Sequence, residues 1–419
     1  MPILSLAIKS LLNRRFTVSL ILISIALSVS LLLGVERLRM ESRNSFANTI
    51  SGADLVVGAR SGAINLLLYS VFRIGDATNN ISWRSYRKFA EHPLVEWTIP
   101  ISLGDSHKGY RVMGTNDDYF RHYLYARQKN LAFHQGQPFA QVYHAVLGYE
   151  VAQKLGYRIG QEIVIAHGAG KTSFVLHDDK PFEVVGILKP TGTPVDRTIH
   201  VQLQGIEAIH KDWVGGRQIP GHKISVEQAL EQDLTPKQIT AFLVGLKNKI
   251  ATFRIQREIN DYRKEPLLAI LPGVTLQQLW DMMSLAENAL LLVTTLVVAV
   301  GLIGMLTVIL AGLNERRREM AILRSVGARP GHILLLVTGE SVLLSLMGIA
   351  IGLLILYGSL ILGLPYIESL YGLYIPISLP SHREWIMLGL IGTSALIIGL
   401  IPGYRAYRQS LADGMSIRI

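Results

Sequence analysis

The order of apolar and polar residues divides the chain into four long apolar runs and one large mixed segment. Phe16–Val35 contains no charged residue, and about 20 helical residues rising about 1.5 Å each can cross a hydrocarbon core of about 30 Å. Three later runs, Ala289–Leu313, Ile333–Leu362 and Trp385–Tyr404, are also long enough to cross. The pattern predicts a membrane protein with one N-terminal span and three C-terminal spans.

The first apolar run has two interpretations. Arg14 and Arg15 precede it, and residues 28–30 (Ser-Val-Ser) resemble a signal-peptide cleavage site. The run continues past that site through residues 31–33, which favours a retained span. Apolar residues repeat at helical spacing between positions 3 and 12, which indicates an interfacial helix before the span.

The polar residues between the second and third runs orient the chain. Asn314–Ile333 is rich in arginine, and basic residues in a short loop mark the cytoplasmic side of a membrane. Lys9 before the first run and Arg405 and Arg408 after the fourth agree with this orientation. The sequence therefore predicts cytoplasmic termini and an extracytoplasmic segment of residues 36–284. The net charge of +10 is spread along the chain, so binding of nucleic acid is not expected.

The extracytoplasmic segment is predicted to be a mixed α+β domain. Short apolar runs separated by Gly, Pro and Asp indicate strands, and longer stretches at helical spacing indicate helices. The strands are expected at Glu162–Ala166, Ser173–His177, Phe182–Leu188 and Thr198–Leu203, and the helices at Trp83–Glu91, Gly148–Leu155 and Thr235–Asn260. A helix over Leu276–Leu292 is expected to continue into the second span. Residues 61–83 are expected to form a packed helix or hairpin, or a loop that contacts a partner.

Most motifs that could carry chemistry have a simpler interpretation. The stretch from His167 to Thr172 contains Gly-Lys-Thr, but Ile165 replaces the first glycine of a phosphate loop, so a hairpin turn is expected. All histidines except His332 and His382 lie between residues 36 and 284. Imidazole and carboxylate suit zinc or copper, but these histidines lack the close spacing of a metal motif, so no metal site is assigned. The histidines considered were His167, His177, His200, His210 and His222, with Asp178 and Asp179 beside His177.

The apolar runs contain two further features. Glu340 lies about eight residues into the third run, where a charged side chain must find a polar partner or extend to the interface. Gly348 and Gly352 form a GxxxG pattern that permits close helix packing. With no cysteine and no catalytic arrangement of residues, an enzyme anchored in the membrane is not supported, and no cofactor is expected in this chain.

Several motifs together resemble permeases of the MacB/FtsX/LolC family of ABC transporters. The resemblance extends over nearly the whole chain, and its most specific part is ERRREMAILRSVGARPGHI at residues 315–333. The other matching segments are LAIKSLLNRR near the N-terminus, GADLVVGA at 52–59, VMGTNDDYF at 112–120, AVLGYEVAQKLGYRIGQEI at 145–163, FEVVGILKPTGTPVD at 182–196 and PGYRAYRQSLADGM ending at Met415.

The resemblance implies a permease subunit without catalytic activity, served by a separate cytoplasmic ABC ATPase that binds ATP and Mg²⁺. Residues 315–329 would form a coupling helix on that ATPase, ended by Gly327 and followed by a helix that starts at Pro330. Apolar contact would come from Met320, Ile322 and Leu323, and charged contact from Glu315, Arg316, Arg317, Arg318, Glu319 and Arg324. The apolar side chains favour docking over a role in topology alone.

The predicted architecture is therefore four transmembrane helices with a large α+β domain between the first and second. The resemblance further divides residues 36–284 into a porter-like part, 36–111 and 223–284, and an inserted distal part, 112–222. The other predicted parts are 1–35 (interfacial helix and first span), 285–313 (second span), 314–332 (coupling loop), 333–363 (third span), 364–384 (outer loop), 385–404 (fourth span) and 405–419 (cytoplasmic tail).

The function implied is mechanotransmission in the bacterial inner membrane, in which ATP hydrolysis moves the periplasmic domain of a permease homodimer. The cargo could be a lipoprotein, a peptide or an amphiphile, with the histidines hinting at a metal-related ligand. An adaptor protein and membrane lipids are further expected partners. The alternative is a signal transmitter that controls a periplasmic partner such as a cell-wall hydrolase.

Overall fold

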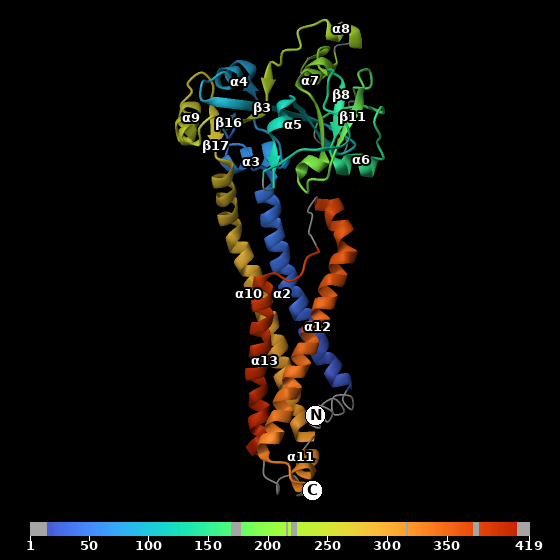
Figure 1. Ribbon diagram of the computed structural model, residues 1–419, viewed down its shortest axis with the longest axis vertical. Coiled ribbons are helices and arrows are strands. Elements are labelled where there is room, and N and C mark those ends of the chain that lie inside the picture. The colour runs from blue at the N-terminus through green and yellow to red at the C-terminus, as the bar shows by residue number, and fades with distance from the viewer. Residues whose placement is uncertain are drawn as a thin grey trace. The chain divides into compact units, whose positions relative to one another are not determined.

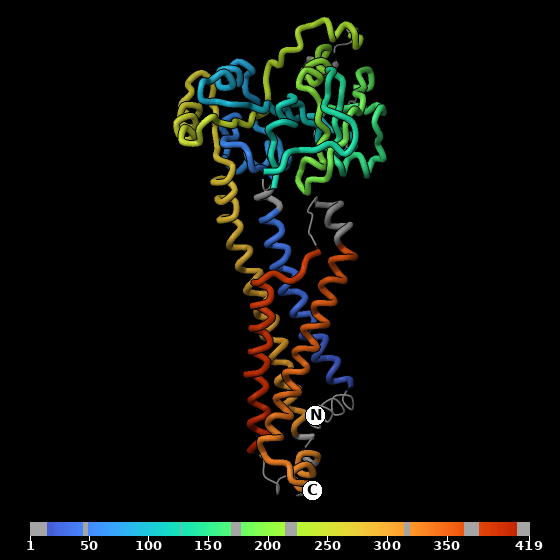
Figure 2. Tube along the Cα trace, viewed as in Figure 1, coloured from blue at the N-terminus to red at the C-terminus, as the bar shows by residue number. Residues whose placement is uncertain are grey.

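The computed structural model describes residues 15–126, 128–168, 177–214, 217–218, 224–315, 317–371 and 377–408 (Figure 2). The chain forms two compact units. The membrane unit contains residues 1–41, 284–369 and 375–419, and the outer unit contains residues 42–283 and 370–374. The interfacial helix expected at residues 3–12 and the residues after Arg408 lie outside the described ranges.

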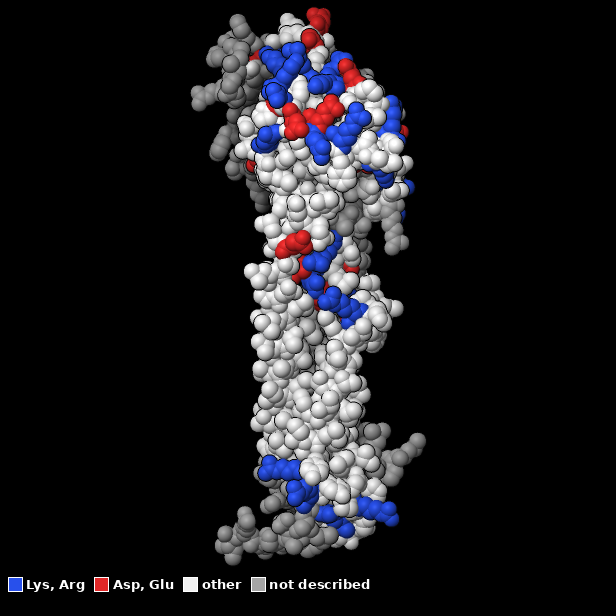
Figure 3. Space-filling model, turned by 90° about the vertical axis from the view of Figure 1, so that its left-hand side faces the viewer, with Lys and Arg blue, Asp and Glu red and all other residues white. Residues whose placement is uncertain are grey.

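The membrane unit is built from long apolar helices (Figure 1). Four of the described helices are long and apolar enough to cross a membrane, with mean hydropathies between 2.0 and 2.7. Figure 3 shows a long stretch of this unit whose visible surface carries no Lys, Arg, Asp or Glu, with charged residues at both ends. The unit contains α11 (Arg317–Ser325), α13 (His382–Arg408) and most of α2 (Arg15–Thr49), α10 (Pro272–Glu315) and α12 (Pro330–Tyr371).

The first span packs against the later spans. Ile25, Val29 and Leu33 of α2 are buried in one apolar cluster with Met305 of α10 and Leu344 of α12. Contacts of this kind with the later spans support the interpretation of α2 as a retained span. The long α10 begins at Pro272 and continues without interruption to Glu315, as expected from the absence of a helix breaker before the second span.

The outer unit is organised around a large mixed sheet. Among the described residues, eleven strands join it, and its main path runs β17-β1-β16-β3-β4-β12-β8-β11-β7. Strand β3 is the longest and pairs with strands of both halves. The strands of the path are β1 (Leu55–Ala59), β3 (Val95–His107), β4 (Tyr110–Thr115), β7 (Phe133–Gly136), β8 (His144–Leu147), β11 (Phe182–Leu188), β12 (Thr198–Gln202), β16 (Ala241–Leu246) and β17 (Leu267–Ile270).

Short strands and helices complete the outer unit. Off the main path, β9 (Glu162–Ile163) pairs with β11 and β10 (Ala166–His167) pairs with β3. Two-stranded pairs join β2 (Ile81–Ser82) with β15 (Gln238–Ile239), β5 (Leu124–Tyr125) with β6 (Lys129–Asn130), and β13 (Trp213–Val214) with β14 (Arg217–Gln218). The helices are α3 (Ala63–Val71), α4 (Trp83–Ala90), α5 (Asp118–His122), α6 (Tyr149–Leu155), α7 (Leu203–Ile209), α8 (Val226–Leu230) and α9 (Thr252–Asn260), with 3-10 turns at Pro194–Arg197 and Lys249–Ala251.

Buried apolar clusters lie within each half of the sheet, and a third cluster contains residues of β1, β3, β4, β8 and β11, so it extends across both halves. Around β1, β16 and β17, residues such as Val57, Phe242 and Ile255 are buried together. Around β8, β11 and β12, Val151, Phe182 and Ile199 form another buried cluster. These clusters fit the α+β architecture that the sequence predicts, with β3 and β4 joining the two halves of the sheet.

Most local predictions are confirmed, and one is wrong. Helices α4 and α6 and strands β11 and β12 lie where the pattern places them. The helix expected over Thr235–Asn260 exists only as α9, because residues 241–246 form the buried strand β16 instead. A short, continuous apolar run fits a buried strand as well as a buried helix, so periodicity alone does not separate them.

Three smaller predictions have different outcomes. Residues 63–71 form a packed helix, α3, whose Leu66 and Leu67 are fully buried, so the helix alternative is confirmed for this part of residues 61–83. Residues 72–80 form neither helix nor strand. The strand expected at Glu162–Ala166 is divided into β9 and the start of β10. The strand expected at Ser173–His177 and the Gly-Lys-Thr turn lie almost wholly outside the described residues.

Candidate functional site

The arginine-rich segment between the second and third spans forms a short helix. Helix α11 ends at Ser325, and Gly327 follows with a φ of 103°. The backbone N–H groups of Gly327 and Ala328 donate to the carbonyl oxygens of Arg324 and Leu323. This conformation is unfavourable for residues with a side chain, so Gly327 ends the helix as expected. Helix α12 then begins at Pro330.

The side chains of this segment have different surroundings. Met320 is 6% exposed and packs inside the membrane unit against Leu313, Ile333 and Val337. This packing differs from the expectation that Met320 contacts a partner, because the residue already contributes to the core of its own chain. Ile322 is 56% exposed, and Val326 is 83% exposed.

The charged residues of the segment are only partly described. Glu319 is exposed and Arg324 is half-buried, and each has an electrostatic or hydrogen-bonding interaction. Arg316 lies outside the described residues, and the side chains of Glu315, Arg317 and Arg318 are not described. Leu323 is half-buried. Binding to an ATPase through these residues therefore stays a prediction.

The polar and small residues of the third span lie inside the bundle. Glu340 is buried and has a hydrogen-bonding or electrostatic interaction, which favours a polar contact within the protein over extension to the interface. A Cβ at Gly348 would come within 2.6 Å of Ile25, and one at Gly352 within 2.8 Å of the Ala26 carbonyl oxygen. The two glycines therefore allow α12 to pack closely against α2.

An ion-pair network in the membrane unit was not predicted. Arg37 Nε lies 3.2 Å from Glu384 Oε1, and both side chains are buried. Arg39 binds Glu36 at 3.1 Å and Glu287 at 2.8 Å. Glu36 also pairs with Arg383 at 3.0 Å. Arg37 Nη2 further donates to the Tyr357 hydroxyl and the Ser378 carbonyl oxygen, so the network joins α2, α10, α12 and α13.

Three of the histidines considered from the sequence lie together in the outer unit. Asp105, His167, His177 and His210 each offer a ligand atom, and these four atoms lie within 4.8 Å of one another. We call these four residues the histidine cluster. His200 is buried elsewhere, in β12, and His222 lies outside the described residues. The cluster was missed because its members are far apart in sequence and because Asp105 was not considered.

Two elements of the sheet explain how the first pair of the histidine cluster meets. Strand β10 runs antiparallel to β3, and His167 lies directly opposite Asp105. Directly opposed side chains project from the same face of a sheet with their Cβ atoms about 5 Å apart. The register of β3 against β4 shifts between Leu103 and Asp105, and Gly104 has a φ of 156° at this irregularity. His167 Nδ1 lies 3.2 Å from Asp105 Oδ1.

The other two members of the cluster come from a loop and a helix end. His210 is the C-cap of α7, and its Nε2 lies 3.1 Å from His167 Nδ1 and 3.8 Å from Asp105 Oδ1. His177 is fully buried, with its ring centroid 4.8 Å from that of His210. The indole of Trp213 covers His177 at a centroid distance of 4.4 Å.

The protonation preferences of two cluster members differ. Burial lowers the pKa of His177 to about 4, and the nearby imidazole of His210 adds to this effect. Its hydrogen bond with Asp105 raises the pKa of His167. At neutral pH, His177 is therefore a neutral imidazole with a free lone pair.

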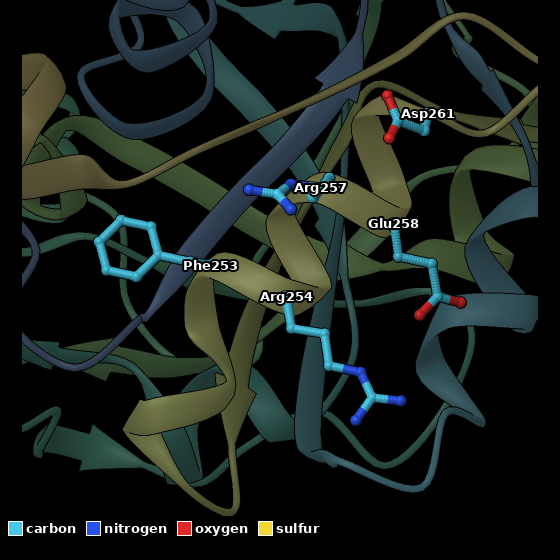
Figure 4. A pocket seen from close by; sticks show the side chains of 5 residues that line it. All are labelled: Phe253, Arg254, Arg257, Glu258 and Asp261. Atoms are coloured by element: carbon cyan, nitrogen blue, oxygen red, sulfur yellow. The ribbon is translucent and has the colours of Figure 1, made fainter.

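A pocket on α9 is a weaker candidate for a binding site than the histidine cluster. Its lining residues, Phe253, Arg254, Arg257, Glu258 and Asp261, all come from α9 or its C-cap. Figure 4 shows their side chains pointing in different directions instead of converging on one point. A site for a small ligand needs convergent polar groups, so this pocket carries no assignment.

Two family models together match most of the chain. Residues 16–262 match the MacB-like periplasmic core domain, and residues 291–411 match the FtsX-like permease C-terminal. The first match covers more than half of the chain and includes α2 and most of the outer unit. The second includes the remaining spans and α11.

Two curated proteins and two solved structures are also similar. The "Macrolide export ATP-binding/permease protein MacB" of Chromobacterium violaceum is 29% identical over 127 residues, which are 30% of this chain and 19% of that protein. The protein of the same name from Syntrophobacter fumaroxidans is 26% identical over 199 residues, 44% of this chain and 27% of that protein. The chain thus spans about a fifth to a quarter of these relatives' length.

The solved structures are extracytoplasmic parts of transporters. The periplasmic region of MacB from Actinobacillus actinomycetemcomitans has a TM-score of 0.35 and 10% identity, over 55% of this chain and 94% of that chain. The extracellular domain of the noncanonic ABC-type transporter YknZ from Gram-positive bacteria has a TM-score of 0.31 and 11% identity, over 52% of this chain and 98% of that chain.

The family and fold class predicted from the sequence are confirmed. Four helices that can span a membrane flank a large α+β domain of the periplasmic type. The protein is therefore a membrane protein with an extracytoplasmic domain. By its two family matches, the chain belongs to the MacB/FtsX family of ABC-transporter permeases.

Proposed function

We propose that this chain is the permease subunit of an ABC transporter that works by mechanotransmission, with ATP and Mg²⁺ bound by a separate cytoplasmic ATPase. Two permease copies would sit in the bacterial inner membrane with their termini in the cytoplasm and their outer units in the periplasm. ATP hydrolysis would move the outer units against periplasmic or outer-leaflet cargo such as a lipoprotein, peptide or amphiphile. An adaptor protein and membrane lipids would be further partners.

The observation that carries this proposal is the exposed apolar side of α11. Ile322 of α11 and Val326, in the turn just after α11, are four residues apart, and the Val326 N–H donates to the Ile322 carbonyl oxygen, so both lie on one side of this segment. Both side chains are largely exposed. Arg324 is two residues from each of them, so it projects from the other side of the segment. Exposed apolar residues on one side of a short helix are typical of a surface that a soluble partner grips, and nearby basic residues such as Arg329 would add to its specificity. Met320 supports this surface from within, because its packing holds α11 against the membrane unit.

The proposal is tested by changing the exposed residues and leaving Met320 intact. In Ile322→Asp/Val326→Asp, loss of two apolar anchors is expected to weaken binding of the cognate ATPase by roughly 30-fold or more, equivalent to about 2 kcal/mol. ATP hydrolysis by the reconstituted complex should fall in parallel. The measurements are co-purification in mild detergent, ATPase activity and the thermal unfolding of the permease.

A matched control is Ile250→Asp, which places the same charge at an exposed isoleucine of the outer unit. This variant should bind the ATPase normally. Equal ATPase binding by the α11 variant and the control would refute the coupling role of α11. Co-purification of a cell-wall hydrolase in place of an adaptor or cargo would favour a signal transmitter over a transporter.

A further inference from the structure

We propose that the histidine cluster of Asp105, His167, His177 and His210 binds a late first-row divalent cation, with Zn²⁺ as the preferred ion. This site is independent of the coupling role of α11 and lies wholly within the outer unit. The proposal rests on the distances between the ligand atoms, the lack of hydrogen-bond partners of His177, and the contacts that orient the ligands.

The distances fit a small four-coordinate ion. Ligand atoms about 2.0–2.1 Å from a tetrahedral Zn²⁺ are about 3.4 Å from one another. The three separations between ligand atoms of Asp105, His167 and His210 are 3.1, 3.2 and 3.8 Å. All four ligand atoms, including one from His177, lie within 4.8 Å of one another, so a small rotation of side chains closes the set around an ion.

His177 supplies an independent observation. Its side chain is fully buried, and neither ring nitrogen has a hydrogen-bond partner. An unsatisfied buried polar group destabilises the folded state, so native proteins rarely leave one without a partner. A cation bound between His177 and the other three residues would satisfy one of these nitrogens. The second ring nitrogen of His177 would still lack a partner among the described residues, as does Trp213 Nε1.

Contacts around the cluster orient the ring of His210 and hold the segment that carries His177. His210 Nδ1 lies 2.8 Å from the Ile206 carbonyl oxygen, which can only accept, so Nδ1 carries the proton and the lone pair of Nε2 faces the cluster. Lys180 is fully buried and binds Asp179 at 3.1 Å and Asp212 at 2.9 Å. The pair of Lys180 and Asp212 joins the segment after His177 to the turn after His210.

The ligand chemistry selects the class of ion. Imidazole nitrogen is a good ligand for Zn²⁺, Cu²⁺, Ni²⁺ and Co²⁺, whereas Mg²⁺ and Ca²⁺ prefer a shell of oxygen atoms. Three imidazoles and one carboxylate give a charge and donor set suited to Zn²⁺. The side chain of His167 is 40% exposed and that of His210 is 25% exposed, so an ion can enter from this side.

The test uses the full-length chain, purified in mild detergent without a polyhistidine tag and stripped with a chelator. Titration with Zn²⁺ against a chromophoric chelator should give one tight site per chain. His167→Ala and His210→Ala should each weaken Zn²⁺ binding by on the order of 100-fold or more, because even outer contacts of metal ligands change affinity by about 10–100-fold. Co²⁺ should give the intense visible absorption of a four-coordinate site in the unmodified chain and lose it in both variants.

Two controls keep the outcomes distinct. His134→Ala removes an exposed histidine outside the cluster and should bind Zn²⁺ normally. Ile322→Asp/Val326→Asp should also bind normally, so failure of the metal site and failure of the coupling proposal are separate results. Thermal unfolding without metal checks that both cluster variants fold. No tight Zn²⁺ site in the unmodified chain, or equal affinity in the folded variants, would overturn the proposal.

Discussion

At the scale of single residues, two buried histidines of the outer unit have different environments. His177 lies among other imidazoles and a carboxylate, whereas His200 lies in β12 beside the aromatic ring of Tyr119. Its Nδ1 lies 3.2 Å from the Val146 carbonyl oxygen, and its Nε2 has no partner. Burial lowers the pKa of His200 to about 3, and the positive charge of Arg73 adds to this effect. His200 is therefore a neutral core residue.

The neutral state of His200 predicts a specific acid sensitivity. Its folded pKa lies below the unfolded value of about 6.5, so its stabilising contribution is complete above pH 6.5 and is lost as pH falls toward 3. Each pH unit below 6.5 then lowers the free energy of unfolding by up to about 1.4 kcal/mol. His200→Phe removes this proton uptake, so its unfolding temperature should fall less steeply between pH 6.5 and 4 than that of the unmodified chain.

The measurement is thermal unfolding of the outer unit in detergent, followed by tryptophan fluorescence at several pH values. His134→Gln serves as the control, because it removes a histidine from the surface. An identical pH slope in the unmodified chain and His200→Phe would show that His200 takes up no proton on unfolding.

At the scale of elements, close packing of α12 on α2 depends on glycine at particular positions. A Cβ at Gly352 would lie 2.8 Å from a backbone oxygen and 2.9 Å from Val29 Cβ, whereas one at Gly358 would meet nothing within 4 Å. Both glycines lie in the same helix, so the helix propensity gained by alanine is similar at the two sites.

Substitution by alanine at Gly352 and at Gly358 should therefore change the stability of the bundle differently. Gly352→Ala is expected to destabilise the bundle by about 1–3 kcal/mol, because the backbone of α2 must move away. Gly358→Ala is expected to be neutral or to stabilise it by up to about 1 kcal/mol. Thermal unfolding of the two variants in the same detergent tests the contrast. A Gly352→Ala variant at least as stable as Gly358→Ala would mean that this helix contact is not close.

At the scale of the whole molecule, the described spans are joined by polar contacts as well as apolar ones. The pair of Arg37 and Glu384 connects the first and last spans, although these residues are far apart in sequence. Removing one partner of a buried pair leaves the other charge without compensation, while replacing both with apolar residues avoids that cost. The network therefore restricts which arrangement of helices is stable.

Glu384→Gln is expected to destabilise the membrane unit by about 3–5 kcal/mol, because Arg37 stays buried without its counter-charge. The double variant Arg37→Met/Glu384→Met should lose much less stability than Glu384→Gln. As a control, Glu91→Gln breaks an ion pair with Arg87 that is 61% exposed on both sides and should cost below about 1 kcal/mol. Unfolding in detergent measures all three, and a double variant less stable than Glu384→Gln would contradict the argument.

The sequence by itself determined the membrane architecture, because the features concerned are local. A span is a continuous apolar run, and the break at Gly327 and Pro330 follows from the conformations that these residues permit. Residues 241–246 mark the limit of local patterns, since only their position between β1 and β3 makes them a strand.

Only the tertiary structure decided which polar residues meet. The strand register sets His167 opposite Asp105, and α7 and the segment before Lys180 bring two further imidazoles to the same point. The burial of Met320 and the pairing of Arg37 with Glu384 likewise depend on helices that are distant in sequence. The physical reason is that hydropathy and propensity act over a few residues, whereas a site depends on distances that packing sets between remote parts of the chain.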